Sequence, residues 1–247
     1  MSAESDVHGQ HPFRGLHGQI VETLGSAIGA KTLVAGDRIV PEDVAETSAV
    51  SRAVVREALK VLEAKGMVEA APRVGTRVRT EEDWDLLDPA VIRWRSAGAD
   101  SAAQFTELLE FRSAIEPLAA RLASERVVSE RLAALRHAVE AMEVAVRRQD
   151  GIAFNEADVD FHRALLVASG NKIVAQQGEP IEAALRVRHA LNLVPSTLTD
   201  AAVSSHRDIV DAIARGDGGR AELASRRIVD VAGAEIMSSL FGSAGAR

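Results

Sequence analysis

The sequence predicts a mainly α-helical protein in two parts. The first is an N-terminal winged helix-turn-helix with a small β-hairpin wing, and the second is an all-α antiparallel helical bundle. Two observations predict this: a basic amphipathic helix precedes two short strand patterns around a turn, and beyond Gly98 every well-patterned segment has helical spacing. Since strand alternation is absent from the second part, helices packing on helices are the architecture expected there.

The basic helix begins near Ser51, which can cap it, and Gly66 can end it in the left-handed conformation. Its buried face is predicted from four apolar residues at helical spacing: Val55, Ala58, Leu59 and Leu62. Arg52, Arg56 and Lys60 recur every four residues and form a stripe away from that face. The stripe starts where helix N–H groups favour anions, so it suits phosphates and base edges.

The segments around this helix complete the winged motif. Pro41–Ser48 can form a short preceding helix with Pro41 at its first position, and Ala49 and Val50 make a tight link. Met67–Ala71 and Thr76–Arg79 are predicted strands around the turn Pro72–Gly75. Basic residues lie at the tip and on the second strand: Arg73 and Arg77. The alternative is that the arginines form a solvated face, as most helical charge runs do. The ordered turn and basic wing favour nucleic-acid binding over this alternative.

The remaining segments are assigned in chain order. We expect residues 1–12 to be a mobile leader, residues 13–80 to be the winged domain and residues 81–100 to be a linker helix. Residues 101–242 are expected to form the helical bundle. The predicted helices are Leu16–Ile28, Trp84–Trp94 after a Thr80 cap, Phe105–Arg126, a segment capped by Ser129 and ending at Arg148, Phe154–Ser169, a segment capped by Asn171 and kinked at Pro180, Asp200–Arg215 and Asp217–Leu240. Pro195–Thr197 breaks the chain between them, and we expect the pivot between the two parts around Asp88 and Pro89.

Composition limits the classes of protein that fit. The chain has 247 residues and no Cys, which excludes disulfides, thiolate metal sites and cysteine nucleophiles. No apolar run approaches a membrane span and the N-terminus lacks a secretory signal, so we expect a cytoplasmic protein without a membrane partner. The net charge is −7, yet residues 50–79 hold seven basic and three acidic residues. A local positive patch on an acidic protein predicts salt-dependent DNA binding by one face.

A second group of polar residues lies on inward faces of the bundle helices. Asp158 and His162 are spaced i, i+4, and His206 shares a face with apolar residues of its own helix. Arg112 lies on an apolar stripe, so it requires a buried anion, for which Glu116 is the ordinary partner. From spacing alone, an ion pair and a hydrogen-bonded core histidine remain the alternatives to a ligand site.

The first part resembles the winged helix-turn-helix of GntR-type bacterial transcription regulators, in the branch of the fatty-acid regulator. The resemblance rests on Val50-Ser51-Arg52, Val55-Arg56-Glu57-Ala58-Leu59, Leu62, Gly66 and Gly75-Thr76. It implies that Arg52 and Arg56, with Ser51, Lys60 and Arg77, contact DNA through the major groove and its backbone, and that the tip from Arg73 to Gly75 enters the minor groove. Some members carry an Arg in the preceding helix, where this chain has Glu42 and Asp43.

The second part resembles the FCD effector domain of the same branch. The matching segments begin at Arg112, Asp158 and His206, and include Glu116, His162, Ser169 and Asn171. In that family an Asp and three His hold a divalent ion that a carboxylate effector coordinates. Asp158, His162 and His206 match three ligands, whereas the fourth falls at or near Ile228, which cannot ligate. Three ligands could hold Zn²⁺ with open positions; alternatively, Arg112 binds an anion without metal.

A further resemblance suggests the class of effector and the function. Residues 154–158 and the linker resemble the sugar-acid branch, the galactonate-operon repressor group. That resemblance implies a carbohydrate-acid effector with Arg112, Asn155 and Ser169 as binding residues. The leading hypothesis is a homodimeric repressor, not an enzyme, that the effector releases from a palindromic operator. The alternatives are a metal-dependent enzyme acting on a small organic acid and a helical scaffold, which would leave the basic wing unexplained.

Overall fold

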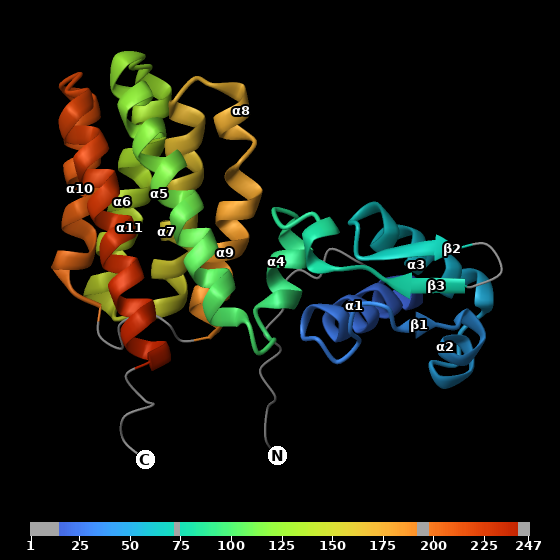
Figure 1. The fold of residues 1–247 in the computed structure, drawn as a ribbon. Helices are drawn as coiled ribbons and strands as arrows, with labels where there is room; N and C mark the ends of the chain where they lie inside the picture. Colours follow the sequence, from blue (N-terminus) through green and yellow to red (C-terminus); the bar gives the residue numbers. More distant parts are fainter. Residues whose placement is uncertain (1–14, 72–74, 192–197, 242–247) are drawn as a thin grey trace. The chain divides into compact units, whose positions relative to one another are not determined.

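A computed structural model of the chain describes residues 15–71, 75–191 and 198–241. The chain divides into two compact units, Met1–Ala99 and Asp100–Arg247 (Figure 1). The predicted leader, the tip of the wing at residues 72–74 and the predicted break at Pro195–Thr197 lie outside the described residues.

The first unit is a winged helix-turn-helix, as predicted. Its elements are α1 (Gly15–Gly29), β1 (Arg38–Ile39), α2 (Pro41–Thr47), α3 (Arg52–Ala64), β2 (Val68–Ala71) and β3 (Gly75–Val78). The strands form an antiparallel sheet in the order β1-β3-β2. The short strand β1 was not predicted, because two residues are too few to show an alternating pattern.

The ends of the basic helix α3 follow the sequence prediction. The Ser51 side chain caps it by accepting a hydrogen bond from the Val54 N–H at 3.3 Å. Gly66 has a φ of +73°, and a Cβ there would lie 2.1 Å from the carbonyl oxygen of Asp83. Glycine is therefore required on both conformational and steric grounds. The four predicted apolar residues of α3 are buried.

The predicted linker helix is shorter than expected. Only Pro89–Arg95 is α-helical (α4), preceded by one 3₁₀ turn, η1, at Glu81–Asp83. Asp88 caps α4 and Pro89 occupies its first turn, where a missing N–H costs nothing. The stretch before Asp88 is not α-helical because Trp84 is extended and buried in the winged core.

The helix α4 belongs to the first unit and packs on α1. Trp94 lies over Gly25 and Gly29, where a Cβ on either glycine would come within 2.6 Å of Trp94 atoms. The Trp94 Nε1–H donates to Glu22 Oε2 at 2.8 Å, and Arg93 forms an ion pair with the same carboxylate. These contacts tie α4 to α1, and the boundary between the two units falls after Ala99 rather than at Asp88.

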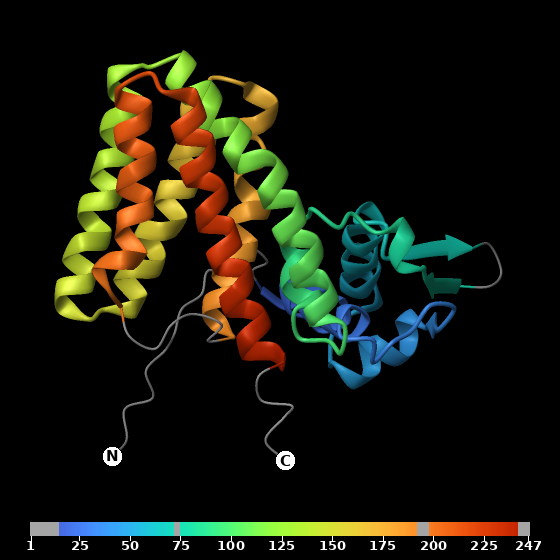
Figure 2. The same ribbon diagram turned by 60° about the vertical axis from the view of Figure 1, so that its left-hand side comes forward.

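The second unit is an antiparallel helical bundle, as predicted (Figures 1 and 2). Its helices are α5 (Ser101–Glu125), α6 (Ser129–Arg148), α7 (Gly151–Ala168), α8 (Lys172–Ala175), α9 (Gly178–Ala190), α10 (Asp200–Ala214) and α11 (Gly218–Phe241). Helix α11 packs extensively on α5 and α10, while α7 packs on α5, α6 and α9. Among the described residues, none of the helices combines the length and apolar character of a membrane span.

Two details of the bundle differ from the prediction. The segment expected to be one helix kinked at Pro180 is two helices, α8 and α9, and Pro180 lies in the first turn of α9. A first-turn proline has no intrahelical N–H bond to lose, so it starts the helix instead of bending it. Ser129 is the first residue of α6 rather than its cap, since Val128 occupies the cap position without a side-chain bond.

The packing of Trp94 on α1 gives a test of the first unit. Gly29→Ala places a methyl group against the backbone of Trp94, so we expect the unfolding free energy of this unit to fall by about 1–3 kcal/mol. Both tryptophans of the chain, Trp84 and Trp94, lie in the first unit, so thermal unfolding followed by tryptophan fluorescence reports on it.

The matched control is Gly151→Ala at the start of α7, where a Cβ would meet no atom within 4 Å. We expect this variant to leave the tryptophan-detected transition unchanged. An equally unchanged transition for Gly29→Ala would contradict the close packing of α4 on α1.

Candidate functional site

The basic stripe of α3 is exposed to solvent. The side chains of Arg52, Arg56 and Lys60 all lie on the surface, while the opposite face of the helix is buried in the winged core. Ser51, also exposed, is at the N-terminal end of the helix. The structure thus leaves the predicted DNA-contacting residues accessible on one helix face.

The acidic residue that departs from the family pattern has a partner on this stripe. Glu42 Oε1 of α2 lies 3.6 Å from Arg52 Nη1, and both side chains are largely exposed. Lys60 is paired with Glu57 at 2.8 Å on the same helix. An exposed ion pair is weak, so both cations can exchange these carboxylates for phosphates. Arg56 forms no ion pair with any described residue.

The wing brings further basic residues beside Gly75. Gly75 has a φ of +90°, and a Cβ there would lie 3.1 Å from Arg38 Nε. Arg77 is exposed on β3 and donates from Nη1 to the Gly36 carbonyl at 2.8 Å. Arg38, on the unpredicted strand β1, was missed by sequence reasoning because β1 was missed. The predicted tip residue Arg73 lies outside the described residues.

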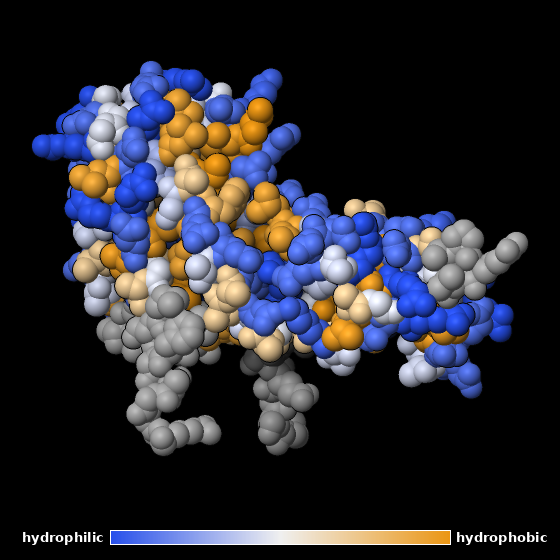
Figure 3. Space-filling view, in the orientation of Figure 1, coloured by the Kyte–Doolittle hydropathy of each residue, from blue (hydrophilic) through white to orange (hydrophobic). Residues whose placement is uncertain are grey.

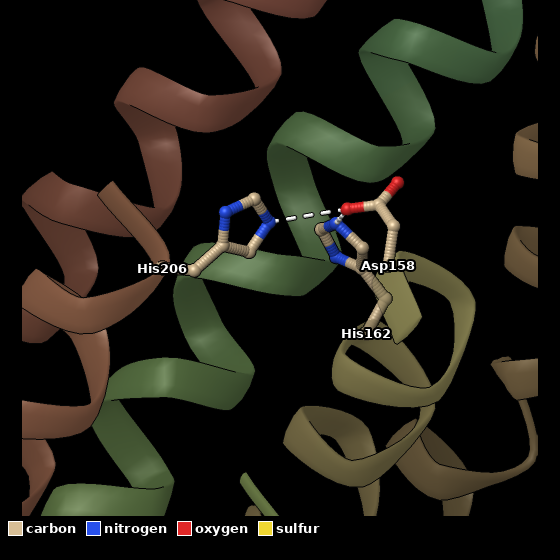
Figure 4. A group of neighbouring side chains, drawn as sticks. All are labelled: Asp158, His162 and His206. Carbon is tan, nitrogen blue, oxygen red and sulfur yellow. Dashed lines mark ion pairs between the residues drawn. The ribbon is translucent and has the colours of Figure 1, made fainter. Parts of the chain in front are cut away.

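The structure brings Asp158, His162 and His206 together in the core of the bundle (Figure 4). Asp158 and His162 come from α7 and His206 comes from α10; each is at most 5% exposed. One ligand atom from each residue lies within 4.8 Å of the others. Asp158 Oδ1 is 3.1 Å from His206 Nε2 and 3.5 Å from His162 Nε2.

The histidines are oriented by contacts on their other ring nitrogens. His206 Nδ1 lies 2.9 Å from the Ala202 carbonyl, which can only accept, so this nitrogen carries the proton. The Nε2 of a neutral His206 is then a lone-pair acceptor that faces another acceptor, Asp158 Oδ1. His206 Nε2 and both ring nitrogens of His162 lack a hydrogen-bond partner of good geometry among the described residues, and the contact of His162 Nδ1 with Glu116 is an ion pair. A cation or an added proton between these atoms removes the repulsion, so the donor set fits a divalent ion.

Glu116 connects this cluster to Arg112. Its Oε1 accepts from Arg112 Nε at 2.6 Å, and its Oε2 lies 2.8 Å from His162 Nδ1. Burial would raise the pKa of Glu116, but the charges of Arg112 and His162 outweigh burial and lower that pKa to about 2. Glu116 is therefore ionised and holds the His162 ring with Nε2 toward Asp158.

Asp158 and His162 are held in charged forms when no metal is bound. Burial alone would lower the pKa of His162, yet the carboxylates of Glu116 and Asp158 raise it to about 9. Burial likewise opposes ionisation of Asp158, but its contacts with the two histidines hold the Asp158 pKa well below the ordinary value. Without metal, protons balance the cluster, so binding of a divalent ion has to release them.

The three predicted effector residues have different surroundings. Arg112 is buried, and its required anion is Glu116 on the same helix. Asn155 lies one turn before Asp158, and its Oδ1 is buried without a hydrogen-bond partner. The Ser169 hydroxyl donates to the Leu166 carbonyl at 2.6 Å and accepts from the Asn171 N–H at 3.1 Å. Ser169 is thus engaged by the helix end, and these contacts favour a structural role for it.

Sequence reasoning missed a second inward arginine, Arg188 on α9. Its signal was available, because Arg188 follows Ile181, Ala184 and Leu185 on the same helix stripe, as Arg112 follows Leu108. Ile228, at or near the expected fourth ligand position, is partly buried and packs against the bundle core. The Asp–His cluster of the described residues therefore has three ligands.

A large hollow of the helical unit lies away from this cluster. It is an open groove of about 680 Å³ between α5 and α11, with Leu109, Pro117 and Val229 among its walls. None of Asp158, His162 and His206 lines it. The groove is open and contains none of the three ligating residues, which are buried in the core of the bundle.

Two domain families match the chain in the order that the fold indicates. Residues 16–78 match the bacterial regulatory proteins of the gntR family, and residues 107–231 match the FCD domain. The galactonate operon transcriptional repressor of Escherichia coli is 31% identical over 218 residues, which cover 85% of this chain and 92% of that protein. The chain belongs to the GntR family and carries an FCD domain. It is a transcription regulator of this type, a finding that favours regulation over the metalloenzyme alternative.

Other GntR proteins extend the comparison. A protein of Paenarthrobacter nicotinovorans described as a probable D-xylose utilization operon transcriptional repressor is 30% identical, covering 73% of this chain and 70% of its own. The structure of Lar, which controls the agr system of Listeria monocytogenes, matches with a TM-score of 0.65 at 17% identity, over 91% of this chain and 97% of its own. At that identity the likeness concerns the fold alone.

The cluster predicts that metal binding depends on Asp158. We expect Asp158→Asn to weaken Zn²⁺ binding by about tenfold or more, because the only carboxylate of the three-ligand group is lost. Isothermal titration calorimetry with ZnCl₂ measures the affinity, and the metal content of dialysed protein measured by mass spectrometry is an independent readout.

Asp160→Asn is the matched control, since Asp160 lies on the same helix but is exposed. It should bind Zn²⁺ as the wild type does. If Asp158→Asn retained wild-type affinity and stoichiometry, the cluster would not be the metal site.

Proposed function

We propose that this GntR protein is a homodimeric repressor of a carbohydrate-acid catabolic operon. In this proposal a small carboxylate, a sugar acid, binds in the FCD domain at the Asp158–His162–His206 cluster and releases the protein from its operator. The cluster holds a divalent ion, which we take to be Zn²⁺. The proposal rests on two features together. One unit has an accessible basic helix, and the other has a buried cluster of three Asp and His residues whose ligand atoms lie close together.

DNA binding is supported by the chemistry of the α3 surface. Arg52 and Arg56 are exposed at the N-terminal half of the helix, where the helix dipole also favours phosphates. In a winged helix-turn-helix the corresponding helix enters the major groove. We assign base and phosphate contacts to Arg52 and Arg56, and backbone contacts to Ser51, Lys60, Arg77 and the wing around Gly75.

The balance of buried charges supports an acidic effector. Glu116 pairs with Arg112, Glu235 pairs with Arg188, and the negative charge of Asp158 is balanced by the protonated His162 when no metal is bound. When bound, a divalent ion supplies a positive centre that attracts carboxylate oxygens. The filled site would thus carry excess positive charge in a region of low dielectric constant, which favours an anion. Asn155 Oδ1, a buried acceptor without a partner, can accept from an effector hydroxyl.

The relatives support a carbohydrate acid as the effector. One is named for the galactonate operon and another for D-xylose utilization. Galactonate is an aldonic acid, with one carboxylate and several hydroxyls, whereas D-xylose is a neutral sugar, so the first name carries the acid and both names carry the carbohydrate. The polar atoms around Asp158 suit that combination better than they suit a large flat ligand.

A two-fold dimer follows from the DNA geometry that the proposal requires. One short recognition helix reads one half-site, and a dimer places two such helices on a palindromic operator. In the view of Figure 3 hydrophilic residues dominate the surface of the winged unit, whereas hydrophobic residues are more frequent on the helical unit. Leu223 and Val231, two turns apart on α11, are each 55% exposed. Apolar exposure of this kind is consistent with self-association through the helical unit.

The DNA-binding assignment predicts the effect of two substitutions. Arg52→Ala with Arg56→Ala should weaken operator binding by about a hundredfold or more, because each lost arginine contact is worth roughly 1–3 kcal/mol. Fluorescence anisotropy with DNA from upstream of the gene measures the change, and the salt dependence of binding should become shallower. Zn²⁺ binding by the helical unit should stay unchanged.

Arg136→Ala with Arg148→Ala is the matched control, since it removes the same charge from exposed positions on α6. This pair should bind the operator within about threefold of the wild type, as expected for exposed charges outside the DNA-binding unit. Normal binding by the Arg52/Arg56 variant, or an equal loss in the control, would refute the assignment.

A further inference from the structure

Arg188 is a largely buried cation on α9 that faces the interior of the bundle. Ile181, Ala184 and Leu185 form the buried stripe of this helix, and Arg188 continues the stripe one turn later. Its side chain is only 12% exposed. A guanidinium cannot lose its charge at neutral pH, so its position requires negative charge nearby.

Arg188 and Arg112 line the same small chamber. The chamber has a volume of about 10 Å³, which is room for about one water molecule. The rest of its wall is apolar: Phe105, Leu108, Leu109, Ala184 and Ile236. Through Arg112 and Glu116 the chamber is connected to His162 of the metal cluster. Two guanidiniums at one apolar chamber repel each other, so an anion bound there would stabilise both.

The carboxylates that pair with the two arginines differ in exposure. Arg112 has the fully buried carboxylate of Glu116 on its own helix; burial opposes the charge, but Glu116 raises the Arg112 pKa. Arg188 instead pairs with Glu235 of α11, whose side chain is 32% exposed. Burial lowers the pKa of Arg188 despite Asp158 and Glu235 nearby. The carboxylate that pairs with Arg112 is thus fully buried, whereas Glu235, which pairs with Arg188, is partly reachable from solvent.

We propose that Arg188 is a second binding residue for the effector carboxylate, and that this carboxylate displaces Glu235 from its ion pair with Arg188. The proposal rests on the proposed function, in which the helical domain binds a small sugar acid. Because the chamber holds no more than a water molecule, the acid enters only when Glu235 and the adjoining Ile236 withdraw. The exchange therefore links effector binding to the α9–α11 contact and gives α11 a different set of interactions in the two states.

Opposite effects of two charge-removing substitutions distinguish this exchange from a structural ion pair. Arg188→Gln removes this binding residue, so the effector should bind roughly 10- to 100-fold more weakly, as expected for a lost charge-assisted hydrogen bond. Glu235→Gln removes the competing carboxylate, so binding should become about three- to tenfold tighter. A structural brace between α9 and α11 would instead give weaker binding in both variants, because both break the same contact.

The experiment is isothermal titration calorimetry on the Zn²⁺-loaded full-length protein. The probes are D-galactonate, the matched diacid D-galactarate and the neutral polyol galactitol, and the tighter-binding acid is carried through the variants. Galactitol should not bind. The control is Arg186→Gln, two residues before Arg188 on α9. It breaks the exposed ion pair of Arg186 with Glu156 of α7 and should leave the affinity for the acid unchanged. In the double variant Arg188→Gln with Glu235→Gln, neither residue of this pair is left charged without its partner. The double variant should bind the acid as weakly as Arg188→Gln does, and it serves as the test if a single variant fails to fold.

The outcomes distinguish a failure of the sugar-acid function from a failure of the exchange between Glu235 and the effector. If neither acid binds the wild type, the sugar-acid function fails and the exchange fails with it. If an acid binds the wild type and the Arg188 variants equally, the function stands and the exchange is wrong. Weaker binding in both Arg188→Gln and Glu235→Gln would also overturn the exchange, in favour of a structural role for the pair.

Discussion

The helical unit depends on one buried carboxylate, that of Glu116. It accepts from Arg112 on its own helix and contacts His162 on α7, so it fixes the orientation of both. A buried ion without partners costs several kcal/mol, and removing one partner from a buried pair costs about 3–5 kcal/mol. The bundle can therefore keep Arg112 and His162 in its core only with Glu116 in place. The geometry of the Asp–His cluster, and with it the ligand chemistry of the site, follows from this constraint.

In the winged unit, close packing and a shared carboxylate hold the last helix, α4, against α1. Trp94 fills the space over two glycines of α1, and Glu22 of α1 holds both Trp94 and Arg93. The segment that sequence reasoning treated as a linker thus belongs to the first unit, which ends at Ala99.

The sequence was sufficient for the elements with long periodic patterns or strong caps. The α3 helix, the two main wing strands and the bundle helices were predicted because burial repeats with the period of each element. The two-residue strand β1 has no such pattern. The break between α8 and α9 was missed because Pro180 can bend a helix or begin one, and only tertiary context decides between these.

The candidate site was predictable in part for a similar reason. Inward faces follow from helical spacing, so Asp158, His162, His206 and Arg112 were each assigned to the core. Which of them meet depends on how α5, α7 and α10 pack, which spacing does not determine. The contact of Glu116 with His162 and the shared chamber of Arg112 and Arg188 therefore appear only in the structure. Ser169 was predicted to bind the effector, but its hydroxyl hydrogen-bonds to the Leu166 carbonyl at the end of its own helix.

The buried Asp–His cluster, with Glu116 beside His162, has the donor set of a cation site. The most direct measurement is anomalous X-ray scattering at the zinc edge from crystals of the Zn²⁺-loaded protein. We expect one strong anomalous peak per chain, bounded by Asp158 Oδ1, His162 Nε2 and His206 Nε2. A map with no peak there, and with the three side chains hydrogen-bonded to one another or to water, would contradict it.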